Sequence, residues 1–217
     1  RGIGKSKPKK LRGFEATNFQ WGTLDMTAVL NWGLKHYPDL EKILIGHSMG
    51  GQLIGTMKNA DKIDRTIIIA SGTGFWKDMP NSKLKFLMPF LWYIYIPLTS
   101  FICGDGGAKK IKQGEDLPKG VALQWRKWCV NDKYWETDFN KETNANSFNK
   151  LKGKLKSISF TDDTIISSQA NKKLLNYFKN ATIETKVITP NEFSLNQIGH
   201  FGFFSQKSEQ IWKCVIK

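Results

Sequence analysis

A single serine lies at the centre of the segment Gly46-His47-Ser48-Met49-Gly50, which fits the pattern G-x-S-x-G. A β-forming run over residues 42–46 precedes this serine, and a helix-compatible run over 48–57 follows it directly. A strand that passes at once into a helix needs a tight turn, whose apex residue has strained backbone angles and an outward-pointing side chain. We expect Gly46 and Gly50 to relieve steric clashes around that apex. The segment therefore predicts a nucleophile elbow with Ser48 as the nucleophile.

A serine hydroxyl becomes reactive when a base accepts its proton and a carboxylate orients that base. His200 is the one histidine after Ser48, and its segment "IGHFGFF" predicts a loop that presents an exposed imidazole. The segment "SFTDDTIIS" places Asp162 and Asp163 at the end of a strand, where open α/β sheets gather their chemistry. Asp163 is the preferred acid and Asp162 the alternative, although either could instead cap the helix expected from Ser167. These residues together predict a Ser-His-Asp triad.

Two neighbours of the serine have different expected roles. The backbone N–H of Met49 opens the helix after the serine, where a developing oxyanion would find a donor. His47 ends the preceding strand, and this position favours packing over proton transfer. The alternative for the whole segment is a glycine-rich turn with an incidental serine.

The overall composition predicts one globular unit with a sizeable core. The chain has 217 residues, 40% of them hydrophobic, and a formal net charge of +14. The basic run over 5–12 could contact an acidic surface or nucleic acid, but no aromatic or arginine cluster accompanies it to read bases. A solvated loop without a nucleic-acid partner is the preferred interpretation.

Three cysteines, at positions 103, 129 and 214, form no C-x-x-C pair and no metal-ligand spacing. This pattern predicts a reducing, cytoplasmic location, with neither a metal nor a cofactor. A competing reading takes Gly4-Lys5-Ser6 as the tail of a phosphate-binding loop. The chain lacks a suitable hydrophobic strand that ends in Asp and could hold magnesium, so this reading is not favoured.

Strand-like and helix-like segments alternate along the chain, as in an α/β protein with a mostly parallel sheet. Strands are expected over 42–46, 65–71, 155–160 and 182–189, and helices over 21–36, 48–57, 167–178 and 207–217. The residues after the second strand lack a clear strand, and they are too many for a simple crossover. The predicted organisation is a core over 1–72, a helical cap insertion over 73–154 and the rest of the core over 155–217.

The stretch Phe86–Cys103 has 18 residues without a charge, close to the lower limit for a membrane span. Pro89 and Pro97 interrupt it. A buried or membrane-facing cap helix is therefore favoured over a span, and peripheral membrane contact through this stretch is a less favoured alternative.

The chain resembles the α/β-hydrolase superfamily, specifically bacterial predicted hydrolases of the serine aminopeptidase and monoacylglycerol-lipase type. The resemblance covers essentially the whole chain through the segments "RGIGKS", "GHSMGGQ", "GEDLPKGVALQWRKWC", "SFTDD" and "IGHFGFF". It implies that Asp163 is the triad acid, although Ser167 occupies the position where relatives usually carry proline. It also implies an acyl-enzyme mechanism without a cofactor.

The resemblance further implies that the segment "RGIGKS" follows the fourth strand of an eight-stranded sheet. The first strands and the second oxyanion donor would then precede Arg1, and the strand over 42–46 would have an unpaired edge. The resulting expectation is a full-length parent that hydrolyses a carboxylic ester, or a related acyl bond, of a hydrophobic small substrate. The chain as it stands would be poorly folded or inactive. The alternative is an inactive ligand-binding protein of the same fold, and the oligomeric state is open.

Overall fold

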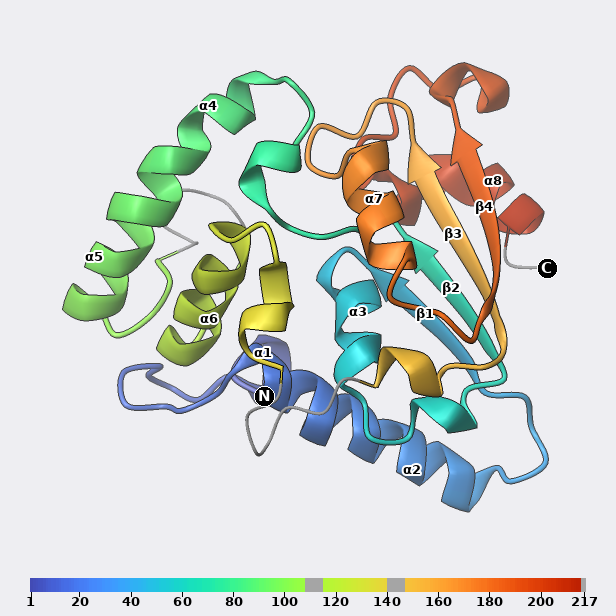
Figure 1. The fold of residues 1–217 in the computed structure, drawn as a ribbon, viewed down its shortest axis with the longest axis horizontal. Helices are drawn as coiled ribbons and strands as arrows, with labels where there is room; N and C mark the ends of the chain where they lie inside the picture. The colour runs from blue at the N-terminus through green and yellow to red at the C-terminus, as the bar shows by residue number, and fades with distance from the viewer. Residues whose placement is uncertain (108–114, 140–146, 216–217) are drawn as a thin grey trace.

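A four-stranded parallel sheet forms the centre of the computed structural model, which describes residues 1–107, 115–139 and 147–215 (Figure 1). The strands follow the order β1-β2-β3-β4 and comprise Ile43–His47, Arg65–Ile69, Lys154–Phe160 and Thr182–Ile188. All three pairings are parallel, with Ile45 opposite Ile67 and Ile67 opposite Lys156. The four predicted strands are confirmed to within two residues at each end.

Helices cover both faces of the sheet, with α3 and α7 on one face and α8 on the other (Figure 1). The α-helices are α1 Asn18–Gln20, α2 Thr27–His36, α3 Met49–Gln52, α4 Lys83–Phe90, α5 Ile96–Ile102, α6 Lys119–Cys129, α7 Ser168–Leu175 and α8 Glu209–Val215. π-Helical turns over Trp21–Met26 and Leu91–Tyr95 join α1 to α2 and α4 to α5, and a 3₁₀ turn over Leu53–Thr56 continues α3. The predicted helices are confirmed, except that positions 216–217 of the last one lie outside the described residues.

Strand β2 shows how the sheet separates two hydrophobic clusters. Ile68 contributes to a cluster with the helices of one face, whereas Ile67 and Ile69 contribute to the cluster beneath α8. This alternation follows from the two-residue period of a strand. All three side chains are almost completely buried, as expected for an inner strand of a parallel sheet.

Helices α4 to α6 occupy the stretch between β2 and β3, where the described residues hold no strand beyond one isolated bridge. This matches the expected helical insertion, although positions 108–114 and 140–146 lie outside the described residues, including Gly114 of the "GEDLPKG" segment. The insertion shares the larger cluster with the sheet face, since Trp92 and Trp128 belong to it together with Leu53. The division into segments 1–72, 73–154 and 155–217 stays a prediction.

Strand β1 lies at the edge of the sheet, and β2 is its only strand partner among the described residues. The side chains of Ile43 and Ile45 are exposed along that strand. The edge predicted for the strand over 42–46 is therefore present.

Candidate active site

Ser48 is the apex of a turn that leads directly from β1 to α3, because β1 ends at His47 and α3 begins at Met49. Its backbone angles are φ 51° and ψ −118°, a sparsely populated conformation for a residue with a side chain. Two contacts hold the turn: Ser48 N–H donates to the carbonyl of Ile69 at 2.9 Å, and Ser71 Oγ donates to the Ser48 carbonyl at 2.7 Å. The strained apex is thus fixed to the end of the neighbouring strand.

The glycines around the apex have unequal roles. A Cβ on Gly46 would lie 2.7 Å from the backbone nitrogen of Gly51 and 2.8 Å from the carbonyl carbon of Gly50, so no side chain fits at Gly46. A Cβ on Gly50 would meet nothing within 4 Å, and the predicted steric need for glycine there is wrong. Gly51 is the constrained position instead, because its Cβ would lie 2.4 Å from Ser71 Oγ.

The side chains of Ser48, His200 and Asp163 form one chain of hydrogen bonds. His200 Nε2 lies 2.9 Å from Ser48 Oγ, and His200 Nδ1 lies 2.9 Å from Asp163 Oδ2. His200 is buried, with 6% of its surface exposed, so the expected exposed imidazole is wrong. The rings of Phe201 and His47 pack against it, at centroid distances of 4.8 and 5.0 Å.

Asp163 is held in place by its own backbone loop. Its Oδ1 accepts from the N–H groups of Ile165 at 2.8 Å and Ile166 at 3.0 Å, which leaves Oδ2 for His200. The carboxylate is buried, and its hydrogen bonds compensate for lost hydration. The helix cap that the sequence offered as an alternative role belongs to Ser167, whose Oγ accepts from the N–H of Ala170.

Asp162 makes different contacts. Its Oδ2 accepts from the backbone N–H groups of Ile198 at 2.8 Å and Gly199 at 2.9 Å, the residues just before His200. Gly199 takes a left-handed φ of 58°, which suits glycine in this turn. Asp162 therefore fixes the loop, whereas Asp163 contacts the imidazole.

His47 adds a contact that the sequence did not predict. Its Nε2 lies 2.8 Å from the backbone carbonyl oxygen of His200, where a protonated Nε2 donates. Burial lowers the pKa of His47 below its ordinary value, so its neutral form is favoured at neutral pH. The ring also packs against Phe201 and Phe204, consistent with the packing role expected for it. Contacts of this kind join residues far apart in the chain, and no local pattern marks them.

A buried hydrogen-bond network links the insertion to the elbow helix. The hydroxyl of Tyr134 donates to Gln52 Oε1 at 2.8 Å, and Gln52 Nε2 donates to the carbonyl of Gly72, just after β2. Burial raises the pKa of the Tyr134 hydroxyl well above its ordinary value, so the hydroxyl remains a donor. The insertion is thereby joined to the last turn of α3 as well as to the hydrophobic core.

Met49 is the first residue of α3, so its N–H has no acceptor four residues earlier within that helix. This is the condition that an oxyanion donor must satisfy. The described residues contain no group of three His, Cys, Asp or Glu side chains arranged to hold a metal ion.

The parallel sheet with an elbow serine after β1 defines the chain as one with the α/β-hydrolase fold. One similar solved structure is an esterase from Pyrococcus furiosus, with 18% identity and a TM-score of 0.55 over 100% of this chain and 65% of that one. Another is the mouse alpha/beta hydrolase domain-containing protein 10, with 13% identity and a TM-score of 0.52 over 100% of this chain and 73% of that one. No family model and no curated protein matches the sequence.

Proposed function

We propose that the protein is a serine hydrolase that cleaves a carboxylic ester, or a related acyl bond, of a hydrophobic small substrate. The observation that carries this proposal is the hydrogen-bond chain from Ser48 Oγ through His200 to Asp163, with both distances at 2.9 Å. These are the contacts that a nucleophile, its base and the orienting acid require. A structural likeness to an esterase supports the same class of reaction.

In the proposed reaction Ser48 Oγ attacks the carbonyl carbon of the substrate while His200 Nε2 accepts the hydroxyl proton. The N–H of Met49 donates to the resulting oxyanion. His200 then gives its proton to the leaving alcohol as the carbonyl–oxygen bond breaks, which leaves an acyl group on Ser48. A water molecule, deprotonated by His200, attacks this ester, and the carboxylic acid and the free serine are released. Asp163 accepts a hydrogen bond from the Nδ1–H of His200 throughout and so fixes the tautomer of the imidazole.

The apolar character of the insertion supports a hydrophobic acyl or aryl group. Helices α4 to α6 and their neighbouring turns hold five of the eight tryptophans. Buried aromatic side chains such as Trp92 and Trp128 line the junction between the insertion and the elbow side of the sheet. Ester, thioester and amide bonds share this chemistry, so an alcohol, a thiol or an amine can be the leaving group.

A fluorophosphonate probe tests the proposal directly, because it reacts covalently with an activated serine. We expect labelling of the wild-type protein and its loss in Ser48→Ala and His200→Ala. Ser6→Ala removes an exposed serine outside the site and serves as the matched control, with labelling retained. A panel of p-nitrophenyl esters of increasing acyl length then measures the preference for apolar groups. Absence of labelling and turnover in a folded wild-type protein that still binds a fatty acyl ligand would favour the non-catalytic binding protein instead.

A further inference from the structure

The segment α4–α5 of the insertion has an apolar face that the described residues leave uncovered. It forms one apolar helix of 20 residues, Lys83–Ile102, with no acidic residue, long and apolar enough by length and composition to cross a membrane. Only 28% of its apolar 18-residue window is buried. A helix that is apolar all round is normally buried on all sides, so its outer face requires a partner.

The buried side of this helix belongs to the folded domain. Met88, Trp92 and Ile96 follow one another at four-residue spacing and join the same hydrophobic cluster as Phe19 and Trp128. Crossing a bilayer would remove these side chains from the core. The helix therefore stays on the domain surface, with its long axis along that surface.

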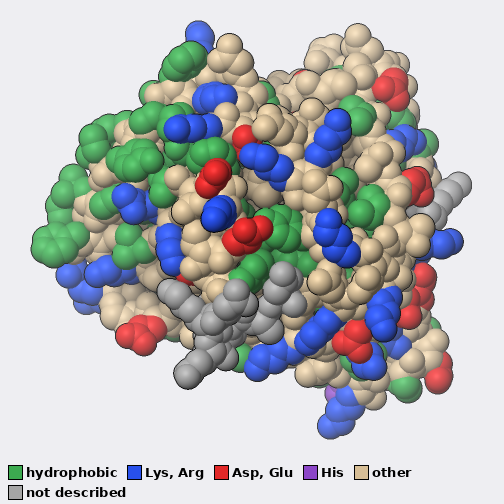
Figure 2. All heavy atoms as spheres, viewed as in Figure 1, with side chains coloured by type: hydrophobic (Ala, Val, Ile, Leu, Met, Phe, Trp, Pro, Cys, Tyr) green, Lys and Arg blue, Asp and Glu red, His purple; other side chains and the backbone are tan. Residues whose placement is uncertain are grey.

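The exposed side of the helix carries large apolar side chains along its whole length. Their exposed fractions are Phe86 76%, Leu87 59%, Phe90 57%, Tyr93 51%, Ile94 54%, Leu98 53%, Phe101 81% and Ile102 57%. At about 200 Å² for each whole side chain, the four aromatic residues alone expose roughly 500 Å². Figure 2 shows hydrophobic side chains gathered on the α4–α5 side of the molecule. A patch of this size marks a binding surface.

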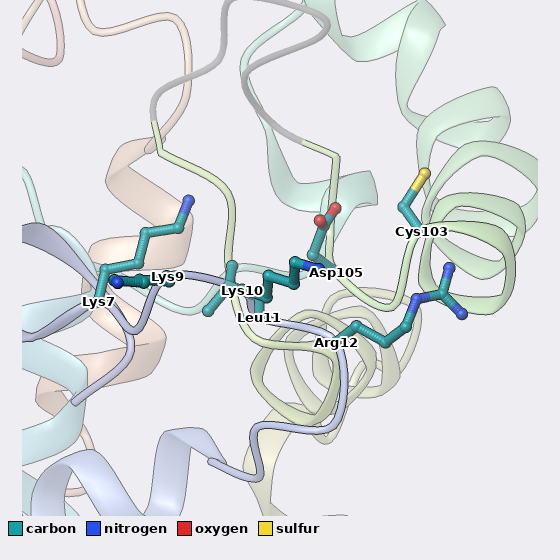
Figure 3. A pocket seen from close by; sticks show the side chains of 7 residues that line it. All are labelled: Lys7, Lys9, Lys10, Leu11, Arg12, Cys103 and Asp105. Carbon is teal, nitrogen blue, oxygen red and sulfur yellow. The ribbon is translucent and has the colours of Figure 1, made fainter.

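Basic side chains lie at both ends of this face. Lys83 is exposed at the start of α4, whereas the ammonium of Lys85 donates to the backbone carbonyls of Lys77 and Met79. The basic run over 5–12 lies at the end of α5. There, four basic side chains and one carboxylate line a pocket of about 350 Å³ with Leu11 and Cys103, as Figure 3 shows: Lys7, Lys9, Lys10, Arg12 and Asp105. The Arg12 guanidinium donates to the carbonyl of Ile102. The charge pattern favours a partner with negative groups beside an apolar layer.

A lipid bilayer with anionic headgroups has this chemistry. Its acyl region accepts the aromatic side chains, while its phosphates meet the lysines at the two ends of the helix. A second copy of the chain fits less well, because its own face would bring further basic groups against these, in a molecule with a net charge of +14. We infer that the outer face of α4–α5, with the basic residues at its ends, docks the protein on anionic membranes with the helix lying in the membrane plane.

Vesicle co-sedimentation tests this inference independently of catalysis, with Ser48→Ala included to show that binding does not need the proposed nucleophile. The probes are vesicles of phosphatidylcholine alone, and of phosphatidylcholine with about one third phosphatidylglycerol. We expect binding to the anionic vesicles that falls as the salt concentration rises. The double variant Phe86→Ser with Phe101→Ser should lower the partition coefficient on the order of a hundredfold. The control Val29→Ser with Trp32→Ser removes two exposed apolar groups from α2, 72% and 56% exposed, and should leave the partition coefficient unchanged.

The charge contribution is tested with Lys9→Gln and Lys10→Gln together, which should lower binding to anionic vesicles about thirtyfold. Lys172→Gln with Lys179→Gln removes two exposed charges elsewhere and should change binding little. Two results would overturn the inference: no sedimentation of the folded wild type with anionic vesicles at low salt, or equal binding by the phenylalanine variant and its control. Dimerisation that the phenylalanine variant abolishes, without vesicle binding, would identify a second copy as the partner and would also overturn it.

Discussion

Exchanging the two neighbouring aspartates for asparagine separates the role of each one. In Asp163→Asn the single side-chain oxygen is needed by the N–H groups of Ile165 and Ile166, so the amide nitrogen must face His200 Nδ1. That nitrogen donates, which forces the imidazole proton onto Nε2. Since Nε2 then cannot accept the proton of Ser48, kcat should fall about 10⁴-fold, the loss that this exchange causes in Ser-His-Asp enzymes.

In Asp162→Asn the remaining oxygen can still accept from the N–H groups of Ile198 and Gly199. The two bonds change from charged to neutral acceptors, at a cost of about 1 kcal/mol each. The free energy of unfolding should therefore fall by about 2 kcal/mol, while kcat stays within about tenfold of the wild type. Each variant thus serves as the control for the other.

The assay combines steady-state hydrolysis of a p-nitrophenyl ester with urea unfolding of both variants. The reasoning predicts a large loss of kcat for Asp163→Asn and near-normal kcat for Asp162→Asn. The unfolding free energy should fall by a similar amount, about 2 kcal/mol, in both variants, because each carboxylate accepts from two backbone N–H groups. If Asp162→Asn lost four orders of magnitude while Asp163→Asn remained active, the assignment of the acid from the contacts of His200 would be refuted.

Three further perturbations test the surroundings of the elbow. His47→Phe should lower the unfolding free energy by about 1–3 kcal/mol by leaving a carbonyl unpaired, and His47→Gln should restore most of it in urea titrations. Burial holds the pKa of His47 below its ordinary 6.5, so as the pH falls the unfolded chain binds a proton before the folded protein does. The unfolding free energy of the wild type should therefore fall as the pH drops below about 6.5. His47→Gln, which lacks the imidazole, should lose this contribution to the pH dependence. Gly46→Ala should cost about 3 kcal/mol through its backbone clash, whereas Gly50→Ala should be neutral or stabilise α3 by up to about 1 kcal/mol, as measured by thermal unfolding. Burial raises the pKa of the Cys129 thiol, whereas Cys214 is exposed. A thiol reagent should therefore modify Cys214 in the native protein and Cys129 only after unfolding. Rapid modification of Cys129 in the native Cys214→Ser variant would contradict this.

The strands and most helices could be predicted because their signals are local. The β-branched run over 65–71 and the pattern before Ser48 need only nearby residues to indicate a strand, an apex and a helix. The order of Ser48, Asp163 and His200 along the chain, with each one after a strand, was also sufficient to propose that they meet at one edge of a parallel sheet.

Features that depend on contacts between distant segments could not be predicted. Glycine is required at position 51 rather than at position 50, because the side chain of Ser71, just after strand β2, occupies the space beside Gly51. The burial of His200 depends on the rings of Phe201 and His47. The spacing of residues along the chain does not give the distance between Ser71 and Gly51 or between the rings around His200. No local pattern therefore indicated that the imidazole would be buried.

The position of the His200 imidazole follows from the sheet rather than from its own loop. Its ring is bonded to Asp163 and its loop to Asp162, both just after β3, while His47 at the end of β1 is bonded to its carbonyl. Strand β2 pairs with both β1 and β3 in fixed register, so these anchors cannot move independently of the strand that presents Ser48. Loss of one loop anchor should therefore weaken the loop without displacing the imidazole far. Asp163 differs because it alone determines which ring nitrogen carries the proton.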